Sequence, residues 1–225
     1  MVESSELPKF AAELVARLLR QAAGSGEGPI SVALAGGTTP RAMHEELARL
    51  PDVPWGRVSI YFGDERCVPA DSPDSNYRVA RESLLERVPI PSDRVHRIHA
   101  ENADRELAAR SYAELLPPAL DLLILGIGED GHTLSLFPGA SSLAESERLV
   151  LPVVGPKPPP QRITLSPAAI AAAREVVMLA SGAGKAEAVK RALEGDWDPS
   201  ATPAQLARAA HWIVDKAAAS SLKSR

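Results

Sequence analysis

Residues 120–125 read LDLLIL, and this apolar run leads directly into the glycine-rich sequence GIGEDG of residues 126–131. A short apolar run that stops at glycines predicts a buried strand, because a strand covered on both faces needs apolar side chains at consecutive positions. The run ISVALA at residues 30–35 has the same character and is also followed by two glycines. We therefore expect both segments to lie inside a sheet that is covered on both faces.

Helical and strand patterns alternate around these two runs. Besides 30–35 and 120–125, strands are expected at residues 58–62, 95–98, 163–165, 176–180 and 211–214. The helical patterns occupy residues 6–22, 40–50, 76–87, 105–115 and 183–193. This alternation predicts the α/β class, with an open, mostly parallel, Rossmann-like sheet and helices on both faces.

The length of 225 residues allows one large domain or two small ones. One low-complexity stretch, PVVGPKPPP at residues 152–160, reads either as a domain linker or as a surface loop. We favour the loop because strand and helix patterns resume after it. A single domain over residues 1–225 is therefore expected.

The net charge of −4 does not favour binding to nucleic acid or to a membrane surface. No apolar run approaches the roughly 18 residues that a membrane-spanning helix needs, and the N-terminal apolar residues are spaced as in a helix rather than as in a signal sequence. Cys67 is the only cysteine, so a reducing, cytoplasmic location is expected. Any positive charge that holds an anionic ligand must then be local.

Ligands of an open parallel sheet bind at the carboxyl ends of its strands, so the loops after the strands are the places to look for a site. The first is Gly36-Gly37-Thr38-Thr39-Pro40. Pro40 suits the first position of a helix, and Thr39 suits its N-cap. Free N–H groups and the helix dipole form an anion site in such a loop, and we favour phosphate binding over an ordinary tight turn.

The second loop is Ser181-Gly182-Ala183-Gly184-Lys185, which also lies between a strand and a helix. A lysine at a helix N-terminus opposes the helix dipole, which is understandable if the lysine holds an anion there. The loop is not a Walker A motif, because its spacing is too short and Ala186 replaces the required Ser or Thr. A solvated lysine after a flexible turn explains the sequence equally well.

The third loop, Gly63-Asp64-Glu65-Arg66, follows the strand at 58–62. Asp64 and Arg66 either belong to a site or pair with each other to hold the loop together, whereas Glu65 is expected to be structural. Cys67 is not expected to be a nucleophile, because its acidic neighbours raise the pKa of its thiol.

The fourth loop runs from Gly126 to His132 and contains G-x-G-x-x-G, the fingerprint of dinucleotide binding. Pro138-Gly139 stops any helix soon afterwards, so no long helix is left to face a pyrophosphate. Asp130 and His132 are more informative, because a histidine that titrates near neutral pH suits proton transfer. We favour a catalytic pair over a histidine bonded to local backbone. No third ligand stands at a metal spacing, so neither a metal nor another cofactor is expected.

Five segments together resemble the 6-phosphogluconolactonase family over nearly the whole chain. They are AGGTTP (35–40), GDERCVPADSPDSNY (63–77), LGIGEDGHTLSLFPG (125–139), RITLS (162–166) and GAGKAEAV (182–189). The resemblance implies a wider superfamily that also holds glucosamine-6-phosphate deaminases and ribose-5-phosphate isomerases. Thr38 stands where family members commonly have serine, and the substitution keeps the hydroxyl.

This resemblance implies hydrolysis of 6-phospho-D-glucono-1,5-lactone to 6-phosphogluconate in the oxidative pentose phosphate pathway. It makes His132 the general base, with Asp130 beside it and with Asp64 and Arg66 lining the pocket; which aspartate orients His132 stays open. The implied phosphate contacts are Gly36, Gly37, Thr38, Thr39, Arg162 and Lys185. The expected partner is thus a small sugar-phosphate lactone, and the protein is expected to be a monomer or a weak homo-oligomer.

The residues themselves agree with hydrolysis that needs no covalent intermediate. The chain has no G-x-S-x-G nucleophile elbow. A lactone already has an electrophilic carbonyl, so one base, one water and donors for the oxyanion suffice.

Two other functions are compatible with phosphate-binding loops. An amino-sugar-phosphate deaminase or isomerase of the superfamily is expected to carry a glutamate just before the Pro-Gly of the fourth motif, where this chain has Phe137. A non-catalytic sugar-phosphate sensor needs the phosphate loops but not His132 and Asp130, and no additional DNA-binding or partner domain is evident in the sequence.

Overall fold

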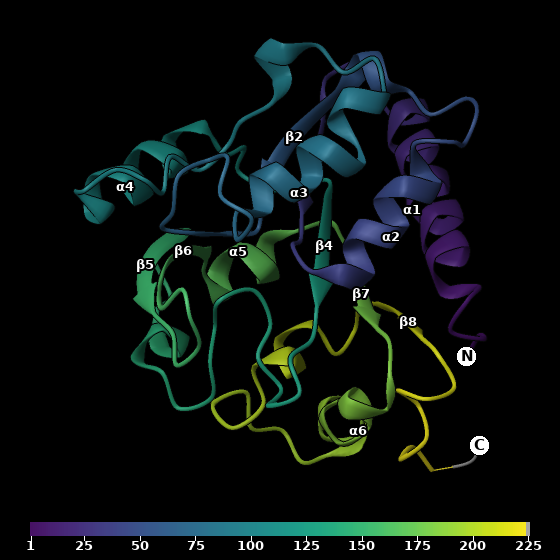
Figure 1. The fold of residues 1–225 in the computed structure, drawn as a ribbon, viewed down its shortest axis with the longest axis vertical. Helices are drawn as coiled ribbons and strands as arrows, with labels where there is room; N and C mark the ends of the chain where they lie inside the picture. The colour runs from purple at the N-terminus through teal and green to yellow at the C-terminus, as the bar shows by residue number, and fades with distance from the viewer. Residues whose placement is uncertain (224–225) are drawn as a thin grey trace.

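A computed structural model describes residues 1–223 and contains a central sheet of five parallel strands. The order across the sheet is β2-β1-β4-β7-β8, and Figure 1 shows β4 in the middle of the molecule. The strands are β1 (Ile30–Leu34), β2 (Val58–Phe62), β4 (Leu122–Gly126), β7 (Glu175–Ala180) and β8 (His211–Val214). The predicted α/β class and the parallel sheet are confirmed.

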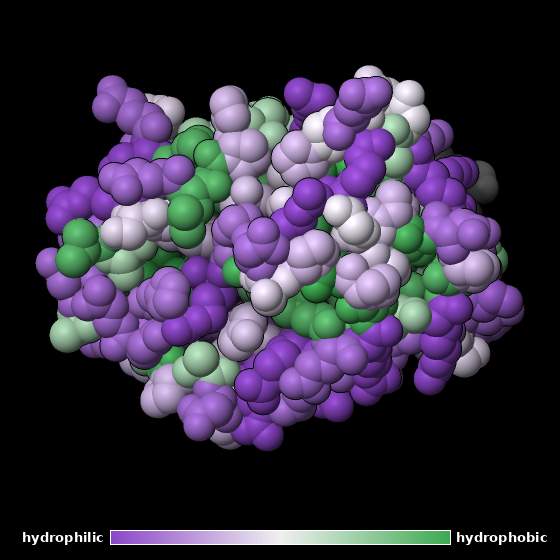
Figure 2. Space-filling model, turned by 90° about the horizontal axis from the view of Figure 1, so that it is seen from above, coloured by the Kyte–Doolittle hydropathy of each residue, from purple (hydrophilic) through white to green (hydrophobic). Residues whose placement is uncertain are grey.

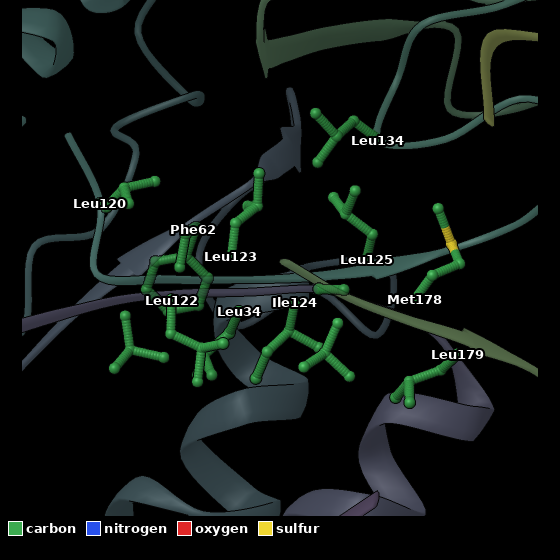
Figure 3. Packing of buried hydrophobic residues seen from close by; sticks show 14 of the residues in the cluster. Leu34, Phe62, Leu120, Leu122, Leu123, Ile124, Leu125, Leu134, Met178 and Leu179 are labelled. Atoms are coloured by element: carbon green, nitrogen blue, oxygen red, sulfur yellow. The ribbon is translucent and has the colours of Figure 1, made fainter. Parts of the chain in front are cut away.

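Strand β4 is buried on both of its faces, as its apolar sequence predicted. Figure 3 shows Leu122 and Ile124 on one side of the strand and Leu123 and Leu125 on the other. All four side chains are 2% exposed or less. Fully burying one such side chain contributes about 1.5–3 kcal/mol, so this strand anchors the core around which the loops are arranged.

Helices cover the sheet on both faces. Helix α1 (Leu7–Gly24) packs against α2 (Thr38–Leu47), which connects β1 to β2, and α3 (Asn76–Ser83) packs on α2 in turn (Figure 1). Helix α6 (Ala186–Glu194) connects β7 to β8 in the opposite direction across the sheet. Because such crossovers are right-handed, the opposite directions place α2 and α6 on opposite faces.

A second, antiparallel sheet of three strands was not expected from the sequence. Its order is β3-β6-β5, and the strands are β3 (Asp64–Arg66), β6 (Gln161–Leu165) and β5 (Val150–Val154). Figure 1 shows helix α4 (Arg105–Leu115) beside β5 and β6. The predicted strand at 163–165 is therefore real but lies outside the parallel sheet. The proline-rich stretch is divided between the end of β5 and the hairpin loop 155–160, which agrees with a loop rather than a linker.

Several predicted boundaries were wrong. Residues 95–98 form no strand, because only Val95 makes an isolated bridge to Ile60. A short helix α5 (Pro167–Ala172) was missed. Helix α2 begins at Thr38 with Gly37 as its N-cap, so Thr39 is not the cap and Pro40 is the third helical residue rather than the first. Pro40 is tolerated there because the first-turn N–H groups of a helix have no partner within the helix.

Within residues 1–223, no helix is long and apolar enough to cross a bilayer. Figure 2 shows that the face seen from above is predominantly hydrophilic, with smaller hydrophobic areas between the polar side chains.

One buried histidine lies away from the loops and is a source of acid sensitivity. His44 of α2 is fully buried, and its Nδ1 lies 3.1 Å from the Ser83 hydroxyl of α3. That hydroxyl donates to the carbonyl of Val79, so Nδ1 of His44 must be the donor. Burial lowers the pKa of His44 to about 4.

We predict that His44 makes the fold less stable as the pH falls from about 6.5 to about 4. Its pKa is near 6.5 in the unfolded chain and about 4 in the folded one, so the unfolded state takes up the proton first. The loss amounts to about 3 kcal/mol by pH 4. Urea unfolding at several pH values measures it, with His44→Leu as the variant that lacks the titrating group. Identical pH dependence in the two proteins would show that His44 is not responsible.

Candidate active site

The candidate site lies where the connections of the sheet reverse direction. β1 and β4 are neighbours, but the chain leaves β1 toward β2 and leaves β4 toward β7. Such a switch point opens a crevice at the carboxyl ends of the two strands. A cavity of about 220 Å³ occupies this place and is lined by loops that follow β1, β2, β4 and β7.

Almost all of the site residues predicted from the sequence meet in this cavity. Asp130 does not line it but contacts His132, which does. The predicted residues in the lining are Gly36, Gly37, Thr38, Thr39, Asp64, Arg66, His132, Arg162 and Lys185. The structure thus brings residues of all four loops together at one cavity.

The loop after β1 presents backbone N–H groups at the start of a helix. Gly37 has φ = +102°, a conformation that favours glycine, and no side chain caps the helix that follows. The N–H groups of the first turn are therefore available to an anion. A Cβ atom on Gly36 would lie 1.8 Å from Oδ1 of Asn76, so only glycine lets this loop approach α3 so closely.

Strand β3, which follows β2 after Gly63, holds two buried carboxylates with different surroundings. Asp64 accepts hydrogen bonds from Nδ2 of Asn76 (3.0 Å) and from Oγ of Ser135 (2.6 Å) at the cavity wall. Glu65 accepts from the Ser75 hydroxyl and from the backbone N–H groups of Asn76 and Tyr77. Glu65 therefore fixes the start of α3, which is the structural role that its sequence position indicated.

The loop after β4 brings His132 and Asp130 into direct contact. Nδ1 of His132 lies 2.5 Å from Oδ1 of Asp130, which also accepts the backbone N–H of His132. The structure thus places Asp130, and not Asp64, on the histidine ring. A Cβ atom on Gly128 would lie 2.1 Å from Nδ1 of His132, so the absence of a side chain at 128 gives the ring its place.

Burial and the carboxylate act on the pKa of His132 in opposite directions. Burial lowers it below its ordinary value, while the hydrogen bond and the charge of Asp130 raise it. The net direction is downward, so the imidazole is neutral at neutral pH. Because Asp130 is only an acceptor, the Nδ1 atom carries the proton and the Nε2 atom has the free lone pair.

The cationic side of the site is formed by the small antiparallel sheet and the loop after β7. Arg66 of β3 and Arg162 of β6 stand directly opposite each other in the antiparallel ladder. Like charges in that arrangement repel each other, and burial lowers the pKa of Arg162. Lys185 reaches the same cavity from the loop after β7. A bound anion would relieve this repulsion.

The Arg162 guanidinium group is held in place by other groups. Its Nε donates to the carbonyl of Pro159 (3.0 Å) and its Nη2 to that of Lys157 (3.3 Å), both in the 155–160 hairpin loop. It also lies over the ring of Phe137, 5.5 Å from the centroid. A solvated arginine at the start of a strand would make none of these contacts.

Sequence reasoning missed three residues of the site. Phe137 packs on the ring of His132 at 4.8 Å between centroids. Asn76 lines the cavity beside Asp64, and Lys157 places its Nζ 3.9 Å from Oδ2 of Asp130. Asn76 and Phe137 lie in the segments 63–77 and 125–139 that carry the family resemblance, but their contacts depend on segments distant in the sequence. Lys157 stands in the proline-rich stretch, where no local signal marks it.

Two other groups considered in the sequence lie apart from the chemistry. Cys67 does not line the cavity, and burial raises the pKa of its thiol. Among residues 1–223, no three His, Cys, Asp or Glu side chains are grouped so that they could hold a metal ion.

An open parallel sheet with a His–Asp pair and several cationic side chains at its switch point defines an α/β protein with a site suited to a small anionic ligand. The family model described as glucosamine-6-phosphate isomerases/6-phosphogluconolactonase matches residues 3–215. The chain belongs to this family.

Relatives and solved structures resemble the protein over nearly its full length. The 6-phosphogluconolactonase of Homo sapiens is 40% identical over 96% of this chain and 90% of its own, and that of Synechocystis is 37% identical over 92% and 90%. The structure of 6-phosphogluconolactonase from Trypanosoma brucei has a TM-score of 0.85 at 34% identity and covers 99% of this chain and 98% of its own. A monomeric glucosamine-6-phosphate deaminase has a TM-score of 0.84 at 23% identity, which shows a common fold only.

We predict that Asp130→Asn lowers the pKa of His132 further. The substitution removes the negative charge that favours the protonated ring and leaves only a neutral amide oxygen as a weaker acceptor, while burial is unchanged. NMR titration of the His132 ring measures the shift. Asp64→Asn is the control, because Asp64 makes no hydrogen bond to the ring, and it should change the pKa less. An equal or larger shift in Asp64→Asn would contradict the assignment of Asp130 as the partner.

Proposed function

We propose that this protein hydrolyses 6-phospho-D-glucono-1,5-lactone to 6-phosphogluconate, a step of the oxidative pentose phosphate pathway. The observation that carries the proposal is the contact of His132 with Asp130 at a cavity that also receives three cationic side chains. The 6-phosphogluconolactonases among its relatives support the same reaction.

His132 is the proposed general base. The N–H group at Nδ1 donates a hydrogen bond to Asp130, so the Nε2 atom has a free lone pair. This atom takes a proton from water as the water attacks C1 of the lactone. Its lowered pKa keeps the ring in the neutral form that accepts a proton. Asp130 holds the tautomer and stabilises the imidazolium ion that forms.

The remaining steps need charge stabilisation rather than a covalent nucleophile. The attack of water leaves negative charge on the former carbonyl oxygen, and a backbone N–H group or a cation such as Arg66 can stabilise it. Collapse of the tetrahedral intermediate breaks the bond from C1 to the ring oxygen. The protonated His132 then returns its proton to that oxygen, which becomes a hydroxyl group.

The phosphoryl group is proposed to bind to the N–H groups of the loop 36–39 together with Arg162 and Lys185. A phosphoryl dianion would offset the repulsion between Arg162 and Arg66 across the small sheet. Binding at a distance from C1 also orients the lactone carbonyl toward His132, which lowers the barrier of the chemical step.

An amino-sugar-phosphate deaminase or isomerase is the alternative function. The shared fold with a glucosamine-6-phosphate deaminase keeps this alternative open. Phe137 argues against it, because this apolar side chain packs on the ring of His132 and offers no titratable group there.

The proposal extends to the setting in which the protein works. We propose that residues 1–225 act as a single domain, as a monomer or weak homo-oligomer in the cytoplasm. Catalysis by His132 and Asp130 requires neither a metal ion nor another cofactor, and neither nucleic acid nor a membrane takes part.

We predict that His132→Asn loses about 10²–10⁴-fold in the catalysed rate, which is the usual contribution of a general base. Stopped-flow hydrolysis of 6-phosphogluconolactone, with the spontaneous rate subtracted, measures the loss. Thermal unfolding of the variant checks that the fold is intact. A variant that keeps its full kcat would remove His132 from the mechanism.

We predict that Lys185→Ala and Arg162→Ala each lower kcat/KM for the phosphorylated lactone far more than kcat/KM for plain gluconolactone. A charge-assisted bond to phosphate is worth about 1.5–3 kcal/mol, which is roughly a 10- to 150-fold fall in kcat/KM. The plain lactone never makes this bond, so its kcat/KM should barely move. Lys190→Ala is the matched control, because Lys190 lies in α6 outside the cavity lining. Equal losses for both lactones in Lys185→Ala would mean that Lys185 does not bind the phosphoryl group.

A further inference from the structure

Asp215 is a buried carboxylate that the proposed mechanism does not use. It follows β8 directly and is completely shielded from solvent. Its two oxygens accept hydrogen bonds from the hydroxyls of Ser4 and Ser181, each at 2.7 Å, and from the backbone N–H groups of Gly182 (3.1 Å) and Ala218 (2.7 Å). Four donors on one carboxylate make a rigid junction, because each charge-assisted bond is stronger than a neutral one.

Two of those donors belong to the loop that carries Lys185. Ser181 and Gly182 leave β7 and begin the turn that ends at Lys185. Gly182 has φ = +94°, so the chain changes direction at the residue whose N–H Asp215 accepts. The backbone N–H of Asp215 in turn donates to the carbonyl of Ala180 (3.2 Å), which joins the two segments a second time. Asp215 thus determines where the loop leaves the sheet.

The charge of Asp215 has the wrong sign for direct help in anion binding. A carboxylate near a phosphoryl group repels it, and the side chain of Asp215 is not among those that line the cavity. Ser181 lines the cavity, but its hydroxyl has a single proton and donates it to Asp215, so it does not donate to a ligand. Both side chains therefore act on an anion through the backbone they hold.

We propose that Asp215 is a positioning residue for phosphate binding: by holding Ser181 and Gly182 it places Lys185 against the phosphoryl group of the substrate. This inference rests on the proposed function, in which Lys185 binds that group. According to this inference, Asp215 contributes to the preference for a phosphorylated lactone over a plain lactone. It does so without contacting either substrate.

The chain offers a closely matched pair of variants. Ser181→Ala and Ser4→Ala each remove one hydroxyl from the same oxygen of Asp215 at the same distance of 2.7 Å. Only Ser181 belongs to the Lys185 loop, whereas Ser4 lies near the N-terminus, ahead of α1. A merely structural contribution of Asp215 would be disturbed alike by both substitutions.

The first test compares kcat/KM for 6-phosphogluconolactone with kcat/KM for plain gluconolactone. We expect Ser181→Ala to lower the ratio of the two values about tenfold, which is the order of one hydrogen bond to a charged group. Ser4→Ala should leave the ratio at that of the parent protein. Equal ratios in the two variants would overturn the inference.

The second test measures whether Asp215→Asn raises or lowers the affinity for phosphorylated ligands. This substitution keeps the size of the side chain and removes its charge. If the carboxylate only repelled the phosphoryl group, this variant would bind inorganic phosphate and 6-phosphogluconate more tightly. If Asp215 positions the loop, the variant binds them more weakly, because its NH2 group replaces one carboxylate oxygen and cannot accept the hydrogen bonds that this oxygen accepts. Tighter binding overturns the inference, and where this variant fails to fold, the two serine variants decide.

Two measurements on the parent protein separate this inference from the proposed function: the hydrolysis assay and calorimetric binding of 6-phosphogluconate. A parent protein that neither hydrolyses the phosphorylated lactone nor binds 6-phosphogluconate refutes both. A parent protein that does both, with Ser181→Ala unchanged in its preference for the phosphorylated lactone, refutes only the role of Asp215.

Discussion

The crevice beside which His132 and Asp130 lie depends on the adjacency of β1 and β4 in the sheet. The chain leaves these two strands in opposite directions, so no connection covers their carboxyl ends. The space left there receives one glycine-rich loop from each strand, and the small size of Gly36 and Gly128 lets Asn76 and His132 occupy it. A side chain at either glycine would overlap a residue of the site before it disturbed the core.

Charges in such a crevice must be held by fixed partners, since a partly buried charge loses much of its hydration. The structure meets this need with carboxylates that accept hydrogen bonds from the surrounding residues. Glu65 fixes the start of α3, Asp64 joins α3 to the loop after β4, and Asp130 holds the histidine ring. The arginines are fixed from the other side by carbonyl groups, such as those of Pro159 and Asp74. The donors and acceptors are thus in place before a ligand arrives, which is the condition for electrostatic stabilisation of a reacting group.

The sequence predicted the parts of the protein that local patterns determine. Apolar runs such as 120–125 that end at glycines predict a buried strand, and the glycines and polar residues after them mark the loops at the carboxyl ends. The antiparallel sheet was missed because β3 is three polar residues long and β5 contains Pro152, so neither has the pattern of a strand. The segment 95–98 has a strand-like composition, but only Val95 bridges to β2. The choice of Asp130 over Asp64 as the partner of His132 depends on side-chain directions, which no spacing rule supplies.

The small antiparallel sheet also determines when the site can form during synthesis. Arg66 meets Arg162 across the β3–β6 ladder, and Ser4 meets Asp215 from a separation of 211 residues. Pairings between such distant segments form slowly, because closing a long loop costs conformational entropy before any favourable contact has formed to offset it. A ribosome that has released the chain only as far as Gly126 has exposed β1, β2 and β4 but not strand β6, which carries Arg162. The nascent protein therefore completes this cavity only after β6 and the loop with Lys185 have emerged, when β1, β2 and β4 are already available to pack.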